Sequence, residues 1–553
     1  MRSGKISAGV REMELFEEFL AMARLHKNYS QHFYPPDLYA MDLIEDRRDL
    51  GPSEISALWE RYAAELPSGQ VNLYITTPFC FRHCSYCLFF KDTVRRAADL
   101  EEYKDRLVGL GGAFAPLFSR LKFSNLFFGG GTPSLFTAPQ LREICEKVIP
   151  LFKVARGGSR TFECEPLTAT KEKLEIIAAA GFNRVSVGVQ SLDRKVLKTL
   201  NRDYQEYGMV RDFLSAARGL GFSLVNVDLM IGVSGDTPRA FLAGFERVLK
   251  LRPTTIAVYQ IVPNQEYLDA YHGGSKEDFF AYSLEFRKKV HPELARIARE
   301  NGFTCPNLAK FCMENKMAGS VVFQDAGVRI RQEYSMNEIG PEDSYLTFGH
   351  RGDSYIPGIA FYQTTPLTRD PADNVFKTTL LDRRRAMEFY CLWKLSSFND
   401  LDRAEFRRLF GRDILAELGP ELREFERAGC AKVLKDKVVF VKTDIKTRFL
   451  VSMVFMGRAR LIRRINAWLR ERAVALRFGE FSYRVFAEYA PGRRLAARVL
   501  PMEGSKRSKI FEERIGSALA GLPAGGLTES LAAFERAMLG LEAGLRRRVG
   551  VKR

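Results

Sequence analysis

The feature that most constrains the fold is an alternation of apolar, β-rich runs with helical segments between residues 70 and 260. The apolar runs cover residues 72–76, 125–128, 160–163, 184–189, 224–230 and 255–259. Segments with apolar residues at helical spacing lie between successive runs, for example at 171–180 and 207–220. Because strands joined by helical crossovers pair in parallel, we expect a parallel α/β sheet, closed or partly closed as a barrel, with functional residues at the carboxyl ends of its strands.

Composition narrows the class of protein. The 553 residues include 84 Lys and Arg and 67 Asp and Glu, a net charge of +17, and 46% are hydrophobic. This content suits several globular domains and argues against collagen, coiled-coil and largely disordered chains. No run approaches the roughly 18 apolar residues of a membrane span, and residues 1–5 lack the apolar core of a signal peptide. We therefore expect a cytoplasmic protein.

The positive charge is concentrated at one end of the chain. Residues 456–553 hold 21 Lys and Arg against nine Asp and Glu, a net charge of +12. Residues 457–478 carry seven Arg and one Glu, with apolar residues at helical spacing, and 528–548 is predicted to be helical as well. A basic amphipathic helix packs on its own protein or lies peripherally on an anionic membrane, and both interpretations stay open. Nucleic-acid binding is disfavoured because charge is its only support.

The remaining patterns divide the chain into four predicted regions. These are an N-terminal helical extension (1–69), a core barrel (70–375), a C-terminal accessory domain (376–455) and a basic, mostly helical extension (456–553). Helical patterns at 383–395, 402–410 and 414–428 precede a hairpin pattern at 431–441. Helices followed by a two-stranded wing indicate a winged-helix-like accessory domain.

Three of the nine cysteines are clustered. An odd number of cysteines, without a signal peptide, is typical of a reducing compartment. Cys80, Cys84 and Cys87 have the spacing C-x3-C-x2-C, and three soft ligands suit zinc or an iron–sulfur cluster. A structural zinc site needs a fourth ligand; His83 directly beside Cys84 would strain the loop, and no second cysteine pair follows nearby. The spacing therefore favours a [4Fe–4S] cluster with one iron open to a ligand.

The residues around this triplet carry a family resemblance. Residues 74–87, Tyr-Ile-Thr-Thr-Pro-Phe-Cys-x3-Cys-Ser-Tyr-Cys, resemble the signature of the radical S-adenosylmethionine (SAM) enzymes, specifically the oxygen-independent coproporphyrinogen III oxidase-like (HemN-like) family. Four further motifs of that family follow in order and at similar spacing, at residues 127–134, 184–191, 200–202 and 228–232. The resemblance covers residues 70–360 strongly and 380–455 weakly.

The resemblance implies cofactors, partners and site residues. Cys80, Cys84 and Cys87 would bind a [4Fe–4S] cluster whose open iron holds SAM, and the reduced cluster would cleave SAM to a 5′-deoxyadenosyl radical. One or two SAM molecules, a small-molecule substrate that is conjugated or lipid-soluble, and a reductant such as flavodoxin or ferredoxin are implied. The positions that match SAM contacts are Tyr74, Tyr86, Gly130, Gly131, Thr132, Glu163, Gln190, Arg202 and Asp228.

These residue types suit such contacts. A sulfonium or ammonium group favours a nearby carboxylate, as Glu163 or Asp228 would supply, and a SAM carboxylate favours an Arg fork such as Arg202. Consecutive glycines let the backbone approach a ligand closely. The alternative is a salt bridge at the barrel rim for the charged residues, and ordinary packing for Tyr74 and Tyr86.

Two departures from the family pattern concern the substrate. The family places a further cysteine two positions after the last ligand, where this chain has Phe89. In a later segment that is usually apolar it has the charged residues His350, Arg351 and Asp353, which are candidate substrate-specific groups or a solvated loop. Both changes argue against coproporphyrinogen III as the substrate.

Three functions then stay open. The first is methyl transfer or carbon–carbon bond formation at an sp2 carbon, with two SAM molecules. The second is oxidative decarboxylation of a tetrapyrrole, and the third is a non-catalytic haem chaperone. The presence of Glu163, Gln190, Arg202 and Asp228 favours the two enzymatic readings.

Overall fold

The computed structural model describes residues 47–64, 69–87, 92–261, 263–305, 320–328, 342–396, 400–427, 429–441, 466, 469–470, 474–478, 481–488, 496–502 and 536. These residues fall into two compact units, one within 43–389 and the other within 390–553. The helices expected at 11–46 and at most of 528–548 lie outside the described residues. In the part of the chain that is described, no helix is long and apolar enough to cross a membrane.

The first unit is built on one 13-stranded sheet in the order β1-β15-β14-β13-β12-β2-β5-β6-β7-β8-β9-β11-β10. Its central strands are parallel. They are β12 (Ser344–Gly349), β2 (Val71–Thr77), β5 (Asn125–Gly130), β6 (Arg160–Cys164), β7 (Arg184–Gln190), β8 (Leu224–Ile231) and β9 (Thr255–Gln260). All six predicted strands lie within this set.

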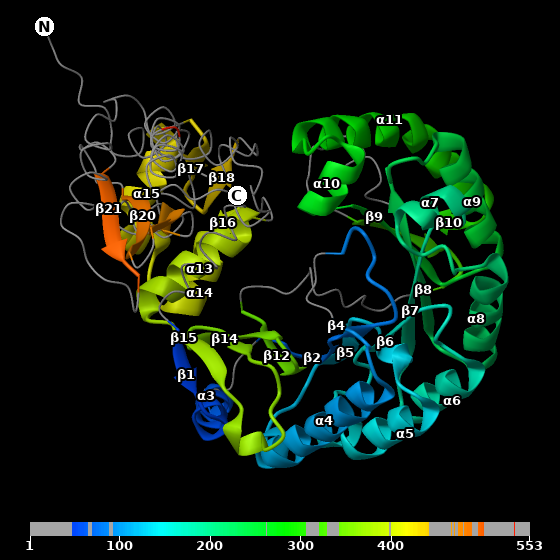
Figure 1. The fold of residues 1–553 in the computed structure, drawn as a ribbon, viewed down its shortest axis with the longest axis horizontal. Coiled ribbons are helices and arrows are strands. Elements are labelled where there is room, and N and C mark those ends of the chain that lie inside the picture. The colour runs from blue at the N-terminus through cyan, green and yellow to red at the C-terminus, as the bar shows by residue number, and fades with distance from the viewer. Residues whose placement is uncertain are drawn as a thin grey trace, which may run out of the picture. The chain divides into compact units, whose positions relative to one another are not determined.

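Helices connect the parallel strands and cover the outer face of the curved sheet (Figure 1). They are α4 (Ala97–Phe118), α5 (Ala138–Lys147), α6 (Lys171–Ala179), α7 (Arg194–Thr199), α8 (Tyr207–Gly219) and α9 (Pro238–Lys250), and α10 (Gln265–Tyr271) and α11 (Lys276–Glu300) follow β9. The predicted helices at 171–180 and 207–220 are confirmed as α6 and α8.

Antiparallel strands extend the sheet at both edges. One edge carries β13 (Asp353–Ile356), β14 (Ala360–Thr364), β15 (Phe376–Leu380) and β1 (Arg48–Leu50), and the other carries β11 (Ser320–Asp325) and β10 (Phe303–Thr304). Because β1 and β10 end the sheet, the barrel is partial among the described strands. Helix α3 (Pro52–Ala64) is helical as expected, whereas β1 is a strand where a helix was predicted.

Burial within the parallel strands singles out polar positions. Strand β8 reads Leu-Val-Asn-Val-Asp-Leu-Met-Ile, and Asp228 is its one residue that is not fully buried. Parallel strands covered on both faces are usually near-continuous apolar runs. Asp228 is therefore an exception in this strand, because it is a carboxylate on the inner side of the sheet with access to solvent or a ligand.

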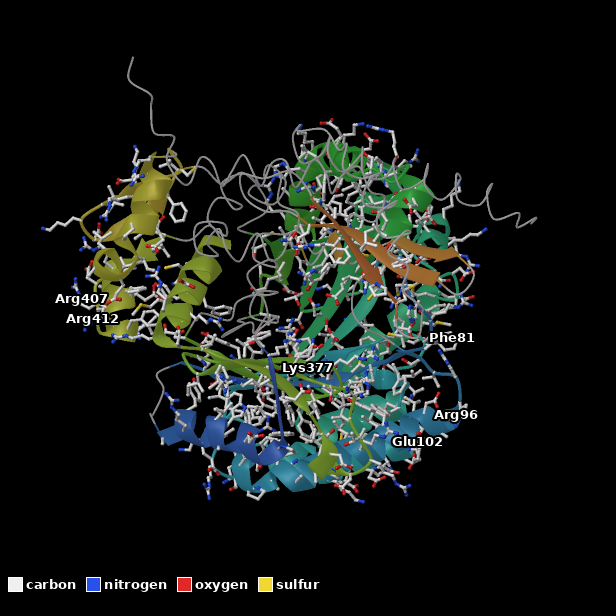
Figure 2. The ribbon with its side chains drawn as sticks, turned by 60° about the vertical axis from the view of Figure 1, so that its left-hand side comes forward. Phe81, Arg96, Glu102, Lys377, Arg407 and Arg412 are labelled. Carbon is white, nitrogen blue, oxygen red and sulfur yellow. The ribbon has the colours of Figure 1, made fainter. Side chains whose placement is uncertain are left out.

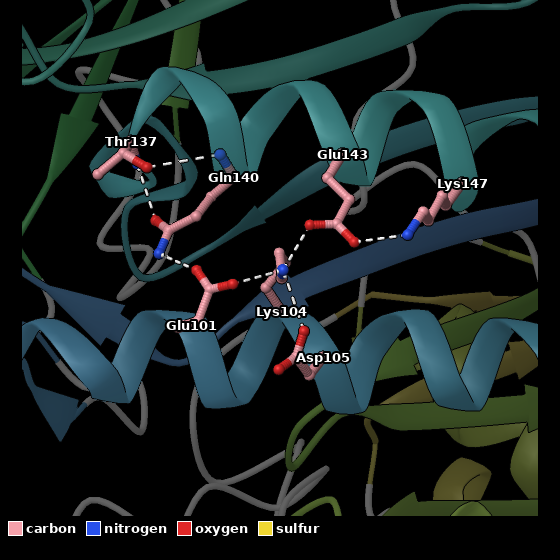
Figure 3. Close-up of polar contacts among 7 residues, drawn as sticks. All are labelled: Glu101, Lys104, Asp105, Thr137, Gln140, Glu143 and Lys147. Carbon is pink, nitrogen blue, oxygen red and sulfur yellow. Dashed lines mark hydrogen bonds and ion pairs between the residues drawn. The ribbon is translucent and has the colours of Figure 1, made fainter.

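A buried lysine ties α4 to α5 on the outer face (Figure 3). The side chain of Lys104 is 5% exposed, and its Nζ contacts Glu101 at 2.6 Å, Asp105 at 3.0 Å and also Glu143. Lys147 pairs with Glu143 at 2.7 Å. Burial opposes the charged form of Lys104, but the three carboxylates outweigh it and raise its pKa. We name these residues the Lys104 cluster.

The second unit contains the predicted accessory region. Helix α13 (Arg383–Ser396) spans the boundary between the units and is followed by β16 (Leu401–Asp402), α14 (Arg403–Phe410), α15 (Ile414–Arg427), β17 (Ala431–Val433) and β18 (Lys437–Phe440). Strands β17 and β18 form the predicted hairpin, and β16 pairs with β18. The winged-helix-like assignment, like the four regional boundaries, stays a prediction.

The prediction for the basic extension was wrong in one part. Residues 474–478 form a strand, β19 (Val474–Phe478), rather than the end of a helix, and β19, β20 (Phe481–Glu488) and β21 (Ala496–Pro501) make an antiparallel sheet. The period-two alternation of residues 474, 476 and 478 was overlooked because a helical pattern precedes it directly. Tyr483 and Val485 are buried and Arg484 between them is exposed, as a half-buried strand requires.

Candidate functional site

The three clustered cysteines lie in one loop at the carboxyl edge of the parallel strands. Cys80 ends β3 (Phe79–Cys80), which follows β2 directly, and the backbone N–H of Cys87 donates to the carbonyl of Cys84 at 3.1 Å. All three side chains are partly exposed and none forms a disulfide. We call residues 80–87 the cysteine loop.

The last residue of α7 and the residues that follow it hold this loop in place. Ser85 donates through its backbone N–H to Leu200 at 3.3 Å and through its hydroxyl to Thr199 at 2.7 Å. The Asn201 side chain donates to the carbonyl of His83 at 2.6 Å, and Arg202 Nε lies 3.3 Å from Cys84 Sγ. The motif at 200–202 is therefore a clamp on the cysteine loop.

Arg202 makes further contacts with the protein. It is 7% exposed, and its Nη1 donates to the Gly188 carbonyl and lies 3.4 Å from Gln205 Oε1. Of the three guanidinium nitrogens of Arg202, Nη2 is the one that makes no hydrogen bond to a described residue. The role of Arg202 as a fork for a SAM carboxylate stays a prediction, and its contact with Cys84 is an additional one.

The glycine-rich turn lies directly against the start of the cysteine loop. Gly130 has φ +103°, and a Cβ there would lie 2.7 Å from the Thr77 carbonyl. A Cβ on Gly131 would overlap the Phe79 carbonyl, while the Thr132 N–H donates to that carbonyl at 2.7 Å. The glycines are therefore required by close packing of the turn on residues 77–79, and their contact with a ligand stays a prediction.

Glu163 and Asp228 form a carboxylate pair on neighbouring parts of the inner sheet face. Glu163 accepts from the Gly130 N–H at 3.1 Å, and Asp228 accepts from Asn226 at 2.7 Å and Ser186 at 3.2 Å. Burial, followed by the charge of Asp228, raises the pKa of Glu163 to about 8. Burial raises the pKa of Asp228 to about 6. Neither acid forms an ion pair with a described residue. The pair therefore suits a positively charged ligand.

Gln190 ends β7 in a strained conformation. Its φ is +66°, and the pairing of β7 with β8 shifts in register between Gly188 and Gln190. A non-glycine residue with positive φ costs free energy and is frequent at ligand sites. The irregularity places Gln190 at the same carboxyl strand edge as Glu163.

The two predicted aromatic contacts have packing partners. Tyr74 stacks on Phe127, with ring centroids 5.5 Å apart. Tyr86 packs against a cluster of buried residues that includes Leu200, Met230 and Tyr267. These contacts agree with the packing alternative for both residues.

Comparison with known proteins decides the family of this region. Residues 74–247 match the family model described as the radical SAM superfamily. This part of the chain is a radical SAM domain. The match contains every predicted site residue, from Tyr74 to Asp228.

Relatives of the radical SAM domain point to one branch of the superfamily. The chain is 30% identical over 232 residues to oxygen-independent coproporphyrinogen III oxidase of Salmonella typhimurium, covering 42% of this chain and 49% of the relative. It is 31% identical over 194 residues to the enzyme of that name from Helicobacter pylori, covering 34% of this chain and 42% of the relative. The chain thus spans about half the length of the curated relatives it matches.

The fold agrees with that branch. The coproporphyrinogen III oxidase HemN from Escherichia coli, titled a radical SAM enzyme, superposes with a TM-score of 0.56 at 22% identity, over 73% of this chain and 93% of that chain. The likeness supports the predicted radical SAM fold.

The residues present fit the cofactors of the superfamily, a [4Fe–4S] cluster and SAM. Within the described ranges, no group of three or more His, Cys, Asp or Glu residues is arranged to hold a single metal ion. In an iron–sulfur cluster each cysteine binds a separate iron. Three thiols spread along one loop, as in the cysteine loop, allow this arrangement. The carboxylate pair would supply negative charge for the cationic groups of SAM.

Sequence reasoning missed one pair of residues at this edge. Glu165 is 3% exposed, its Oε1 accepts from the Tyr204 hydroxyl, and its Oε2 is buried without a hydrogen-bond partner. The Tyr204 ring also packs edge-on against Phe81, at 5.6 Å, and lies under Arg82. The run Glu-Cys-Glu at residues 163–165 was the available signal, because alternate residues of a strand share a face.

A cavity of about 630 Å³ opens beside the cysteine loop, and its lining includes Phe79, His83, Arg95, Arg106 and His350. His350 Nδ1 accepts from the Leu367 N–H at 3.1 Å, so a neutral ring carries its proton on Nε2. His350 is one of the three candidate substrate-specific residues, and it lines this cavity. Asp353 instead accepts from Gln363 at 3.0 Å within the sheet.

Proposed function

We propose that this protein is a HemN-related radical SAM enzyme that cleaves SAM reductively. The observation that carries the proposal is the cysteine loop, clamped by residues 199–202 at the strand edge where the carboxylate pair lies. When bound, a reduced [4Fe–4S] cluster on Cys80, Cys84 and Cys87 supplies the electron that breaks a carbon–sulfur bond of SAM.

The other site residues bind and orient SAM in this proposal. Glu163 and Asp228 attract its cationic groups, and Nη2 of Arg202 binds its carboxylate. Gly130, Gly131 and Thr132 keep the turn flat against residues 77–79, so that their backbone lines the SAM site. Gln190 offers an amide at the same edge.

For the reaction, we favour methyl transfer or carbon–carbon bond formation at an sp2 carbon with two SAM molecules. Two sequence departures support it: Phe89 replaces a family cysteine, and charged residues occupy the segment at 350–353. Oxidative decarboxylation of a tetrapyrrole is the second candidate, because the relatives are named coproporphyrinogen III oxidases. A haem chaperone without catalysis is the third.

One variant tests the core of the proposal. Cys80→Ala should lose the brown iron–sulfur absorbance and all SAM cleavage under anaerobic, reducing conditions, because a cluster ligand is gone. Cys145→Ala is the matched control, since Cys145 is buried in α5. Retention of both absorbance and SAM cleavage by Cys80→Ala would refute the proposal.

Products distinguish the three reactions. S-adenosylhomocysteine together with a methylated acceptor indicates methyl transfer, and CO2 indicates decarboxylation. Haem binding with no product indicates a chaperone. We expect the first result when the unaltered protein is incubated with SAM, a reductant and candidate conjugated substrates.

We also propose that the basic extension, 456–553, makes peripheral membrane contact in the cytoplasm. Its net charge of +12 supports attraction to anionic lipid. Deletion of 456–553 should abolish co-sedimentation with phosphatidylglycerol liposomes, and unchanged sedimentation would contradict the idea. The deletion variant must retain its cluster absorbance as a control for folding.

A further inference from the structure

The outer face of α7 carries only positive charge. Arg194, Lys195 and Lys198 are exposed, and none of them makes an ion pair in the described part of the chain. Asp193 does not neutralise them directly, because it caps the helix and accepts from the N–H groups of Lys195 and Val196. Three lysine and arginine side chains thus project into solvent from less than two turns of helix.

This helix leads directly into the clamp on the cysteine loop. Thr199 ends α7, and the carbonyls of Thr199 and Leu200 bind Ser85. The charged face of α7 is therefore adjacent in space to the residues between the cluster ligands. No insertion or separate domain is needed to bring the two together.

An exposed aromatic residue lies on the same loop. Phe81 is 44% exposed, although it follows Cys80 directly, and Figure 2 shows it at the outside of the unit. Its neighbour Arg82 pairs with Asp203 at 2.7 Å. Exposed aromatic residues bordered by charged groups are typical of protein interfaces.

The charges of this surface sum to a positive value. This surface has four cations, Arg82, Arg194, Lys195 and Lys198, and two anions, Asp193 and Asp203. Its net charge is therefore +2. We call these six residues, with Phe81, the α7 surface.

We propose that the α7 surface is the docking site of a small acidic protein that carries one electron. The inference rests on the proposed function, in which each SAM cleavage consumes one electron from outside the chain. The carrier loses one electron, the cluster gains it, and no bond or proton changes hands at the interface. Electron-transfer partners form small, weak complexes that depend on charge complementarity, which suits a compact basic patch around one aromatic residue.

Charge reversal on α7 tests the proposal. Lys195→Glu/Lys198→Glu changes the α7 surface by four charge units without touching a residue of the site. The matched control is Lys122→Glu/Arg156→Glu, which makes the same change at exposed residues near the amino-terminal ends of β5 and β6. Each protein is tested with a reduced acidic flavodoxin and, separately, with dithionite.

The expected result separates docking from chemistry. At low salt the flavodoxin-driven rate of SAM cleavage should fall at least about tenfold in the α7 variant, while the dithionite-driven rate stays unchanged. The control variant should match the unaltered protein with both reductants. An α7 variant as active with flavodoxin as the unaltered protein would overturn the proposal.

A binding measurement keeps the docking proposal testable if the proposed function fails. The unaltered protein should bind oxidised flavodoxin, with an affinity that falls as salt is added, and the α7 variant should bind about tenfold more weakly. Equal binding by the two proteins contradicts docking, whatever the outcome of the SAM assay. Binding to phosphatidylglycerol vesicles that persists after deletion of 456–553 but is lost in the α7 variant would identify the α7 surface as a membrane surface and also overturn the proposal.

Discussion

Two groups of charged residues in the first unit have opposite electrostatic character. In the Lys104 cluster one buried ammonium contacts three carboxylates, and the pKa values of Glu101 and Glu143 are lowered by their hydrogen bonds to Lys104. Among the described residues no cation forms an ion pair with the carboxylate pair, and burial raises the pKa values of Glu163 and Asp228 although the charges of Arg184 and Arg202 oppose the shift. One group is ion-paired within the fold, whereas the other would gain an ion-pair partner from a cationic ligand.

The difference separates structural charge from functional charge. A cation enclosed by acids stabilises the packing of α4 on α5, and its removal leaves uncompensated charge. Two acids that share a half-buried site disfavour their own ionisation, which a bound cation would reverse. The location agrees, since the Lys104 cluster lies on the outer face of the sheet and the carboxylate pair on its inner side.

The largest expected effect concerns ligand affinity. Glu163→Gln should weaken SAM binding about 10- to 100-fold, because a hydrogen bond or ion pair to a charged group contributes about 1.5–3 kcal/mol. Isothermal titration calorimetry measures the affinity. Glu143→Gln, the equivalent change in the Lys104 cluster, should leave the affinity unchanged. If both variants lose affinity equally, the comparison fails.

The reverse test measures stability. Lys104→Met should lower the free energy of unfolding of the first unit by about 1–2 kcal/mol, chiefly because Glu143, whose side chain is 29% exposed, loses its partner. Glu101 and Asp105 are exposed to water. Asp228→Asn should leave stability unchanged or increase it, since it removes a desolvated charge. Urea titration followed by circular dichroism compares the two variants. Loss of stability in Asp228→Asn alone would reverse the assignment.

The third prediction concerns pH. With its pKa raised to about 8, Glu163 is mostly protonated at pH 7 in the absence of ligand. A cationic ligand favours the carboxylate, so binding releases a proton and SAM affinity rises with pH until about pH 8, by about three- to tenfold per unit. Calorimetry in buffers of different ionisation enthalpy measures the proton release. Glu163→Gln should flatten the dependence, and an affinity that falls with rising pH would contradict the prediction.

The smallest expected effect belongs to the rim of the Lys104 cluster. Lys147→Ala removes an exposed pair one turn apart on α5, and should change the free energy of unfolding by less than about 0.5 kcal/mol. The same urea titration resolves this value from that of Lys104→Met. A larger loss would show that the exposed pair contributes as much as the buried lysine.

The predictable part of the fold was the parallel sheet. Its strands read as continuous apolar runs bounded by helices, and six such runs gave six strands at nearly their observed bounds. The short strands were harder. β1 pairs with β15, more than 300 residues away, and three residues carry too little pattern to reveal such a pairing. β19 follows a helical pattern directly, so its period-two alternation of apolar residues was interpreted as part of the helix.

The candidate site divides in the same way. The cysteine spacing and the glycine-rich motif are local, so they could be recognised in the sequence. The contact of Arg202 with Cys84 and the bond of Tyr204 with Glu165 join residues 118 and 39 positions apart, and only the pairing of the strands brings them together.

The sequence by itself determined the radical SAM domain, its parallel strands and the cysteine spacing from which a cluster is proposed. Each of these depends on short-range spacing: the period of strands and helices, and the distances along the chain between cysteines. Only the tertiary structure decided which acids form no ion pair among the described residues, why Gly130 and Gly131 cannot carry side chains, and that the α7 surface adjoins the cysteine loop. These properties depend on burial and on neighbours from distant strands, because desolvation and charge pairing act through space.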